Sequence, residues 1–357
     1  MSEDFPYSGP LPAFAATSGP RNAKIALIAE AWGDQEEKTK IPLIGTTGQE
    51  LNRMLIEAGI NRSECFASNV FALRPTANKI DSLCLDKKGV GGKTYTLPPT
   101  NMGKYIEPRF FPELERLKAE LEIVRPNLVI ALGAISCWAL LQSPKIGSIR
   151  GTTAESLLVP GLKCLPTFHP SAVYRNWSLR PIVIADLMKA KREAEFPDIK
   201  RPQRFILVRP SIPEMWQWWR EHGAHARYLS VDIETTKGQI RNIGFASSRS
   251  HAINIPFIVK DKSYWPTHCG ELAARQFISM ALQSPAVKIG QNFLYDLQYL
   301  LREGFRVNNY REDTMLLHHA LYPEMQKGLG FLGSIYTSEA SWKLLRGKAE
   351  ELKADDE

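Results

Sequence analysis

The chain of 357 residues is poor in cysteine and has no long hydrophobic run. Its five cysteines form an odd set without a C-x-x-C pair, which excludes the usual framework of a disulfide-stapled secreted domain. No apolar stretch approaches the roughly 18 residues that a membrane-spanning helix needs. Residues 1–20 also lack the basic-then-apolar pattern of a secretory signal peptide. We therefore expect a protein of the reducing cytoplasm that has no membrane partner.

Internal repeats are absent too, so the sequence does not predict a solenoid or a propeller. Hydrophobic residues make up 44% and charged residues 23% of the chain, which is ordinary for a globular protein with proper cores. The formal net charge of +7 suits a polyanionic partner such as DNA.

The length is sufficient for two domains, and a polar, proline-bearing segment separates them. This segment, Phe196-Pro197-Asp198-Ile199-Lys200-Arg201-Pro202-Gln203, follows a predicted helix at 181–194. The predicted division is an N-terminal arm at 1–21, a first domain at 22–196, a linker at 197–203, a second domain at 204–345 and a charged tail at 346–357.

Two carboxylates lie two residues apart in the second domain. The residues from Arg227 to Ile233 favour a strand, so Asp232 and Glu234 point to the same face. Like charges at that distance repel unless a cation lies between them, and carboxylate oxygens are ligands that Mg²⁺ and Mn²⁺ prefer. A third carboxylate, Asp296, lies where a predicted strand at 287–290 gives way to a predicted helix at 294–303. We expect these three side chains to bind two divalent ions and to act in phosphodiester hydrolysis.

Residues 204–345 resemble the 3′→5′ proofreading exonuclease domain of family A DNA polymerases, especially those of phages. Asp232 and Glu234 match its first motif, and the segment from Asn292 to Asp296 matches its second. The resemblance implies a ribonuclease-H-like fold, substrate contact by Asn292 and catalysis with Mg²⁺ or Mn²⁺. One motif is missing, because no Tyr in this chain has an Asp four residues later. The position expected for that motif lies just beyond Glu357.

The first domain carries polar loops at the ends of predicted strands. The apolar run Lys24–Ala29 predicts a buried parallel strand, and a glycine-punctuated loop then leads to a helix at 49–58. Such a loop at a helix N-terminus suits the recognition of a phosphate or a polar ring. Further along come Phe66-Ala67-Ser68-Asn69-Val70 and Thr167-Phe168-His169-Pro170-Ser171, and each of these pieces alone is a weak signal.

Residues 22–195 resemble the uracil-DNA glycosylase superfamily, nearest to its family 4 branch. The segments that carry the resemblance are Ala29-Glu30-Ala31-Trp32-Gly33, Lys40 to Gly45 with Gly48, Asn69, Arg150-Gly151 and Thr167-Phe168-His169-Pro170-Ser171. The resemblance implies that Asn69 reads an extruded uracil, that His169 stabilises the departing base, and that Glu30 orients water or offsets the charge of the sugar. Leu43 and Gly45 would line the base pocket, and Arg150 and Arg175 would contact phosphates.

Two departures from that family stand out. The position of the aromatic ring that stacks on uracil holds Leu43, and the proline of the first motif is Trp32. The family 4 resemblance would also imply four cysteines that bind an iron–sulfur cluster. The cysteines here, at 65, 84, 137 and 164, form no C-x-x-C pair and lie mostly in apparent core elements, so we predict no cluster.

The predicted fold class is α/β, with a doubly wound parallel-sheet glycosylase-like domain followed by a ribonuclease-H-like domain with a mixed sheet and flanking helices. Three functions remain open. The first is a DNA enzyme of phage-type replication or repair that joins a metal-dependent 3′→5′ exonuclease to a glycosylase-like domain. The second is the N-terminal piece of a split family A polymerase that needs a separate polymerase chain. The third is a non-enzymatic DNA-binding accessory with degenerate sites. By resemblance, such a protein acts in the cytoplasm of a phage-infected bacterial cell.

Overall fold

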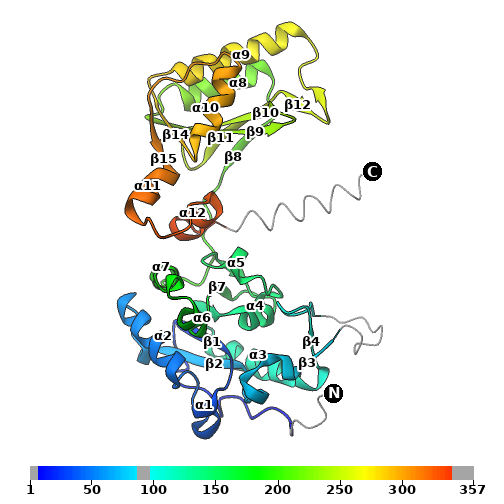
Figure 1. Cartoon of the computed structure of the whole chain (residues 1–357), viewed down its shortest axis with the longest axis vertical. Helices are drawn as coiled ribbons and strands as arrows, with labels where there is room; N and C mark the ends of the chain where they lie inside the picture. The colour runs from blue at the N-terminus through cyan, green and yellow to red at the C-terminus, as the bar shows by residue number, and fades with distance from the viewer. Residues whose placement is uncertain (1–6, 87–96, 340–357) are drawn as a thin grey trace. The chain divides into compact units, whose positions relative to one another are not determined.

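The computed structural model describes residues 7–86 and 97–339 of the chain (Figure 1). The described residues fall into two compact units. One unit holds the residues up to Lys200 together with those from Gly330, and the other is Arg201–Leu329. The segment after Leu329 therefore belongs to the first unit here, whereas the sequence-based division keeps it in the second domain to residue 345. The tail predicted at 346–357 lies outside the described residues.

The first unit is built on a five-stranded sheet with the order β2-β1-β5-β7-β6. Every neighbouring pair is parallel except β6 and β7. The strands are β1 (Ile25–Ala31), β2 (Cys65–Phe71), β5 (Leu128–Leu132), β7 (Lys163–Thr167) and β6 (Ala154–Glu155). Strands β2, β5 and β7 are buried along their whole length, and their residues are mainly apolar, with Ser68, Asn69, Lys163 and Thr167 as buried polar exceptions.

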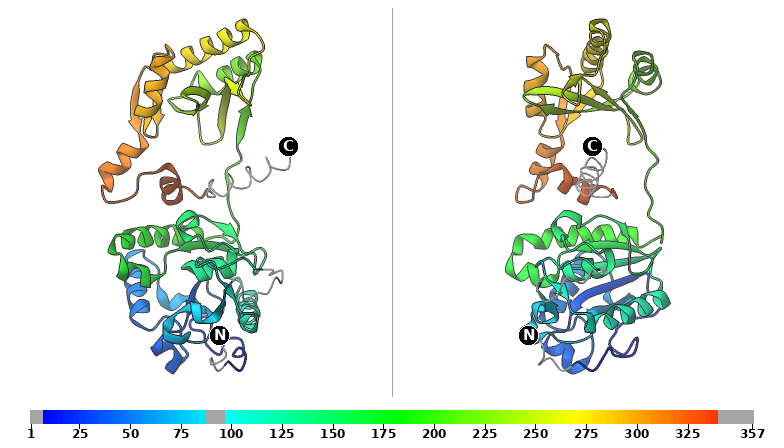
Figure 2. Two further views of the ribbon diagram at one scale, coloured as in Figure 1. Left: turned by 45° about the vertical axis from the view of Figure 1, so that its right-hand side comes forward. Right: turned by 90° about the vertical axis from the view of Figure 1, so that its right-hand side faces the viewer.

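Helices cover both faces of this sheet (Figure 2). On one face, α3 (Pro112–Val124) and α4 (Ala134–Leu141) enclose a core that includes Ile28 and Phe66. On the other face, α2 (Thr46–Glu57), α6 (Pro170–Arg175) and α7 (Arg180–Glu193) enclose a second core. The smaller elements are α1 (Asp34–Thr39), α5 (Ile146–Ile149), α12 (Leu329–Tyr336), β3 (Cys84–Leu85), β4 (Tyr105–Ile106) and 3₁₀ turns at Arg62–Glu64, Thr76–Asn78, Ile80–Leu83, Pro108–Phe110 and Trp177–Leu179.

The second unit contains a six-stranded mixed sheet with the order β15-β14-β9-β10-β11-β8. Strands β9, β10 and β11 form an antiparallel meander, while β14 is parallel to β9, β15 to β14, and β8 to β11. The strands are β8 (Phe205–Val208), β9 (Tyr228–Thr236), β10 (Gln239–Ala246), β11 (His251–Pro256), β14 (Val287–Gly290) and β15 (Tyr310–Asp313). Apart from β8, this is the strand arrangement of the ribonuclease-H-like fold.

Alternation along β9 separates its core side from its polar side. Leu229, Val231 and Ile233 are buried in one core with residues of α9. Asp232 and Glu234 point to the opposite face, where both are exposed, as the period of two predicts. The remaining elements are α8 (Ile212–Trp218) with a π turn at Trp219–Gly223, α9 (His268–Gln283), α10 (Phe293–Arg302), α11 (Thr314–Leu321), β12 (Ile258–Val259) and β13 (Lys262–Ser263).

The predicted fold class is thus confirmed for both units. Within the described ranges, no helix has the length and apolarity that crossing a membrane requires.

Candidate functional site

A cavity of about 300 Å³ lies at the carboxyl ends of the strands in the first unit. Four residues predicted from the sequence line it together, namely Glu30, Leu43, Asn69 and His169. They come from β1, the loop before α2, β2 and the loop after β7. Parallel strands end at one edge of a sheet, which is why residues so distant in sequence meet there.

The His169 side chain is held as a neutral hydrogen-bond donor. His169 caps α6, and its Nδ1 accepts a hydrogen bond from the backbone N–H of Ser171 at 3.2 Å. Since Nδ1 accepts, the neutral ring carries its hydrogen on Nε2. Burial lowers the pKa of His169, the charge of Arg175 lowers it further, and the carboxylates of Glu30 and Glu36 oppose both effects. An Nε2–H donor on a neutral ring can stabilise negative charge on a departing base.

The Asn69 side chain is 2% exposed, and its Oδ1 has no hydrogen-bond partner among the described residues. Its main chain is fixed by Arg116, whose Nη2 donates to the Asn69 carbonyl oxygen at 2.7 Å. Arg116 is itself buried in ion pairs with Glu113 and Glu120 on α3. The i, i+3 and i+4 spacing of these three charges on an otherwise apolar helix face is the sequence signal for this support.

Glu36 holds the loops of the cavity wall, a role that the sequence analysis did not predict. Its carboxylate accepts backbone N–H groups of Gly33 at 3.2 Å, Ile44 at 3.1 Å and Gly45 at 2.8 Å. Gly45 therefore contributes through its backbone and is not a lining residue. The available signal was the Gly33–Glu36 capping-box spacing, in which a Glu at the third helical position bonds back to the N-cap backbone.

Leu43 adopts a left-handed backbone conformation with φ of 60°. A Cβ atom at Gly48 would lie 1.9 Å from the Leu43 carbonyl oxygen, so only glycine lets α2 approach this loop. This close approach places the aliphatic Leu43 side chain in the wall, at the position where the family has an aromatic ring.

Gly133 brings the two expected catalytic side chains close together. It precedes α4 with φ of 93°, and a Cβ atom there would lie 2.6 Å from Glu30 Oε1 and 2.9 Å from His169 Cβ. A larger residue would push Glu30 and His169 apart.

Arg150 is not among the lining residues of the cavity, contrary to the expected phosphate contact. It is 4% exposed, pairs with Asp186 through Nε at 3.0 Å, and donates from Nη1 to Ser334 Oγ at 2.9 Å. A guanidinium with those partners supports the packing of the segment after Leu329. Arg175 also lies outside the lining set, at the exposed end of α6.

The cysteines of the first unit lie on different elements. Cys65 begins β2, Cys84 begins β3, Cys137 is in α4 and Cys164 is in β7. Burial raises the pKa of Cys65 to about 11, that of Cys84 to about 11 and that of Cys164 to about 12, which disfavours the thiolate form that binds metal. These four cysteines do not fit an iron–sulfur cluster, and the absence of such a cluster stays a prediction.

In the second unit, Asp296 lies beside the carboxylates of β9. It lies in the first turn of α10, is 4% exposed, and its Oδ1 accepts the backbone N–H of Ile233 at 2.9 Å. Burial raises the pKa of Asp296 to about 6, and the charge of Asp232 adds to this effect. Partial desolvation of its carboxyl group, and then the charge of Glu234, raise the pKa of Asp232. These oxygen donors suit Mg²⁺ or Mn²⁺ in kind, although among the described residues no group of three or more carboxylates, histidines or cysteines converges as a metal cage.

Asn292 has a structural role beside this site. It is exposed and left-handed, with φ of 54°, and it caps α10. Its backbone N–H and that of Phe293 both donate to Asp313, which also caps α11. Asp313 therefore fixes the starts of two helices next to Asp296.

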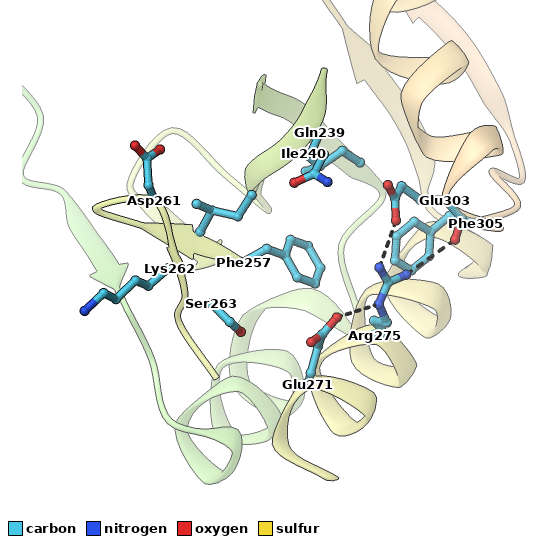
Figure 3. Close-up of a pocket in the computed structure, with 11 residues that line it drawn as sticks. Gln239, Ile240, Phe257, Asp261, Lys262, Ser263, Glu271, Arg275, Glu303 and Phe305 are labelled. Carbon is cyan, nitrogen blue, oxygen red and sulfur yellow. Dashed lines mark hydrogen bonds and ion pairs between the residues drawn. The ribbon is translucent and has the colours of Figure 1, made fainter. Parts of the chain in front are cut away.

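A different cavity in the second unit, of about 330 Å³, contains none of these carboxylates (Figure 3). Arg275 projects into it and forms ion pairs with Glu271 at 3.2 Å and Glu303 at 2.8 Å. Because two carboxylates neutralise it, Arg275 offers no free positive charge to an anion there.

Comparison with known proteins identifies the family of the first unit. Its residues are matched by the model of the uracil DNA glycosylase superfamily, over 16–196. A type-4 uracil-DNA glycosylase of Thermotoga maritima is 32% identical over 177 residues, which cover 48% of this chain and 79% of that protein. A type-4 enzyme of Pyrobaculum aerophilum is 27% identical over 164 residues, covering 44% of this chain and 70% of that protein.

Two further comparisons extend beyond that family. A DNA polymerase of Bacillus phage SP01 is 22% identical over 225 residues, covering 61% of this chain but only 21% of the polymerase. The EXD2 exonuclease domain soaked in Mn and GMP overlaps 37% of this chain and 68% of its own, with 14% identity and a TM-score of 0.26.

The matched span holds β1, β2, β5 and β7 and every residue that lines the Asn69–His169 cavity. The chain therefore belongs to the uracil DNA glycosylase superfamily.

Proposed function

We propose that the first unit binds a uracil flipped out of DNA in the Asn69–His169 cavity and cleaves its N-glycosidic bond. The observation that carries this proposal is the meeting of Glu30, Asn69 and His169 around one cavity at the ends of three strands. An extruded pyrimidine can be read there by its polar edge.

Each residue has a chemical role in that reaction. The Asn69 amide oxygen can accept a hydrogen bond from N3–H of uracil, and the amide NH₂ group can donate to O4. The glycosidic bond breaks with its electron pair moving to the base, and the neutral His169 donates from Nε2 to the O2 that gains negative charge. Glu30 offsets the positive character of the sugar and orients the water that adds to C1′. Arg175, exposed at the end of α6, remains the candidate for a phosphate contact.

A gel assay with a single-stranded DNA that contains one uracil tests this function. In EDTA, followed by alkali, the wild-type protein should produce one cut at the uracil. Asn69→Leu keeps the approximate side-chain volume and removes the polar edge, so it should abolish that cut. A matching strand with thymine in place of uracil is the control, and an uncut uracil strand would refute the proposal.

A metal-dependent 3′→5′ exonuclease in the second unit is a second function, favoured by the carboxylates on one face of β9. Asp232, Glu234 and Asp296 would bind Mg²⁺ or Mn²⁺, which would activate water and stabilise the leaving oxygen. Asn292 would lie near the 3′ end of the DNA strand. A 5′-labelled strand should shorten from its 3′ end with Mg²⁺ and stay intact with Asp232→Ala.

The similarity to part of a phage DNA polymerase supports a variant of this second function. In that variant, a separate polymerase chain completes the exonuclease site. Digestion that requires the addition of such a chain would support it, whereas DNA binding without any digestion or excision would support an accessory role.

A further inference from the structure

Two polar side chains in the wall of the Asn69–His169 cavity are buried and lack partners. Asn69 is 2% exposed and Trp32 is 7% exposed, and both line the cavity. Among the described residues, neither Asn69 Oδ1 nor Trp32 Nε1 has a hydrogen-bond partner. A buried polar atom without a partner is costly to a folded protein, so each such atom calls for an explanation.

The two residues occupy neighbouring positions in the sheet. Asn69 of β2 pairs with Ala29 of β1, and Trp32 is the first residue after β1. The Trp32 backbone is fixed, because its N–H donates to the Leu73 carbonyl oxygen at 3.0 Å. Its side chain forms a small hydrophobic cluster with Ala16 and Ala72. An unpartnered donor and an unpartnered acceptor therefore belong to the same wall.

The chemistry of the two atoms differs in one respect that affects base selection. A side-chain amide can rotate to present either its oxygen or its nitrogen, so Asn69 alone can match uracil or cytosine. The indole Nε1–H is a donor only. It therefore complements the O4 carbonyl of uracil and repels the 4-amino group of cytosine.

We infer that Trp32 is a specificity-determining residue of this cavity, whose indole N–H selects a base with a carbonyl at position 4. In the bound state, Asn69 Oδ1 accepts the N3–H of the base and Trp32 Nε1 donates to O4. Both unpartnered atoms are then satisfied by one ligand. The residue also supplies an aromatic surface in a wall where Leu43 has none. This inference rests on the proposed base-binding function of the same cavity.

Binding to uncleavable strands tests the inference separately from excision. Two oligonucleotides, with 2′-fluoro-deoxyuridine or 2′-fluoro-deoxycytidine at one position, are titrated against wild type and Trp32→Phe. Phenylalanine keeps an aromatic ring and removes the N–H together with the second ring of the indole. The variant should lose roughly tenfold in affinity for the uracil strand, the size expected for one lost hydrogen bond, with little loss for cytosine. Equal weakening of both strands would show that Trp32 only packs, and would overturn the inference.

A spectroscopic measurement on the unmodified chain covers the case in which Trp32→Phe fails to fold. The indole ¹H–¹⁵N resonance of Trp32 should move downfield on addition of the uracil strand and not on addition of the cytosine strand. An unmoved resonance with bound uracil strand would overturn the inference while leaving the proposed function intact. If wild type binds neither strand more tightly than a control strand without the modified base, the proposed function fails and the inference fails with it.

Discussion

The Glu36 carboxylate should control the stability of the cavity wall. It accepts three backbone N–H groups, two of them through Oε1 from Ile44 and Gly45. In Glu36→Gln, the amide oxygen can keep those two, but its NH₂ group then faces the N–H of Gly33. One charge-assisted bond is lost and two become neutral, which we expect to cost about 2 kcal/mol. For a domain of this size, that corresponds to a fall in Tm of roughly 4–8 °C.

Glu37→Gln is a matched control, because Glu37 lies on the same helix and its exposed carboxylate contacts only Arg74 among the described residues. Thermal melting followed by circular dichroism gives the stability of both variants. Hydrogen exchange of the Gly33 amide gives the local effect, since this amide loses its acceptor and should exchange faster only in Glu36→Gln. Equal melting temperatures and unchanged exchange at Gly33 would refute the role of Glu36.

Three further predictions concern other described groups. The pKa of His169 is lowered in the folded state, so the unfolded chain binds more protons than the folded chain as pH falls below the ordinary value of about 6.5. The free energy of unfolding should therefore fall below that pH. Urea unfolding at several pH values should show this slope in wild type and not in His169→Gln. Lys189 Nζ donates to the carbonyl oxygens of Gly151, Ser334 and Thr337. Lys189→Met should therefore destabilise the first unit by about 3 kcal/mol. Lys191 is exposed on the same helix, so Lys191→Met should melt like wild type. Mn²⁺ should raise the melting temperature of wild type and not that of Asp296→Asn. The Asn side chain keeps an acceptor for the backbone N–H of Ile233. An equal response of both proteins would exclude Asp296 as a metal ligand.

The sequence predicted the fold class and several site residues because those features depend on local patterns. Alternation along β9 placed Asp232 and Glu234 on one exposed face. The resemblance to the glycosylase superfamily supplied Asn69 and His169, and the structure brings both to the same cavity.

The roles of Gly133 and Arg150, and the bonds of Glu36 to Ile44 and Gly45, depend on tertiary contacts that no local pattern shows. Glu36 has the ordinary appearance of a residue in the first helical turn, and only the folded loop brings Gly45 to it. Gly133 matters because Glu30 and His169 lie against it. Arg150 was expected to face DNA, but Ser334 is separated from it by the whole second unit in the sequence and still accepts its hydrogen bond.

The release of free uracil tests the central claim most directly. Wild-type protein is incubated in EDTA with a uracil-containing strand, and the free base is quantified by mass spectrometry. Excision by the first unit's own residues predicts that wild type releases uracil, that Asn69→Leu does not, and that a cytosine strand yields no free base. No free uracil from folded wild-type protein would contradict the account of the Asn69–His169 cavity as a glycosylase site.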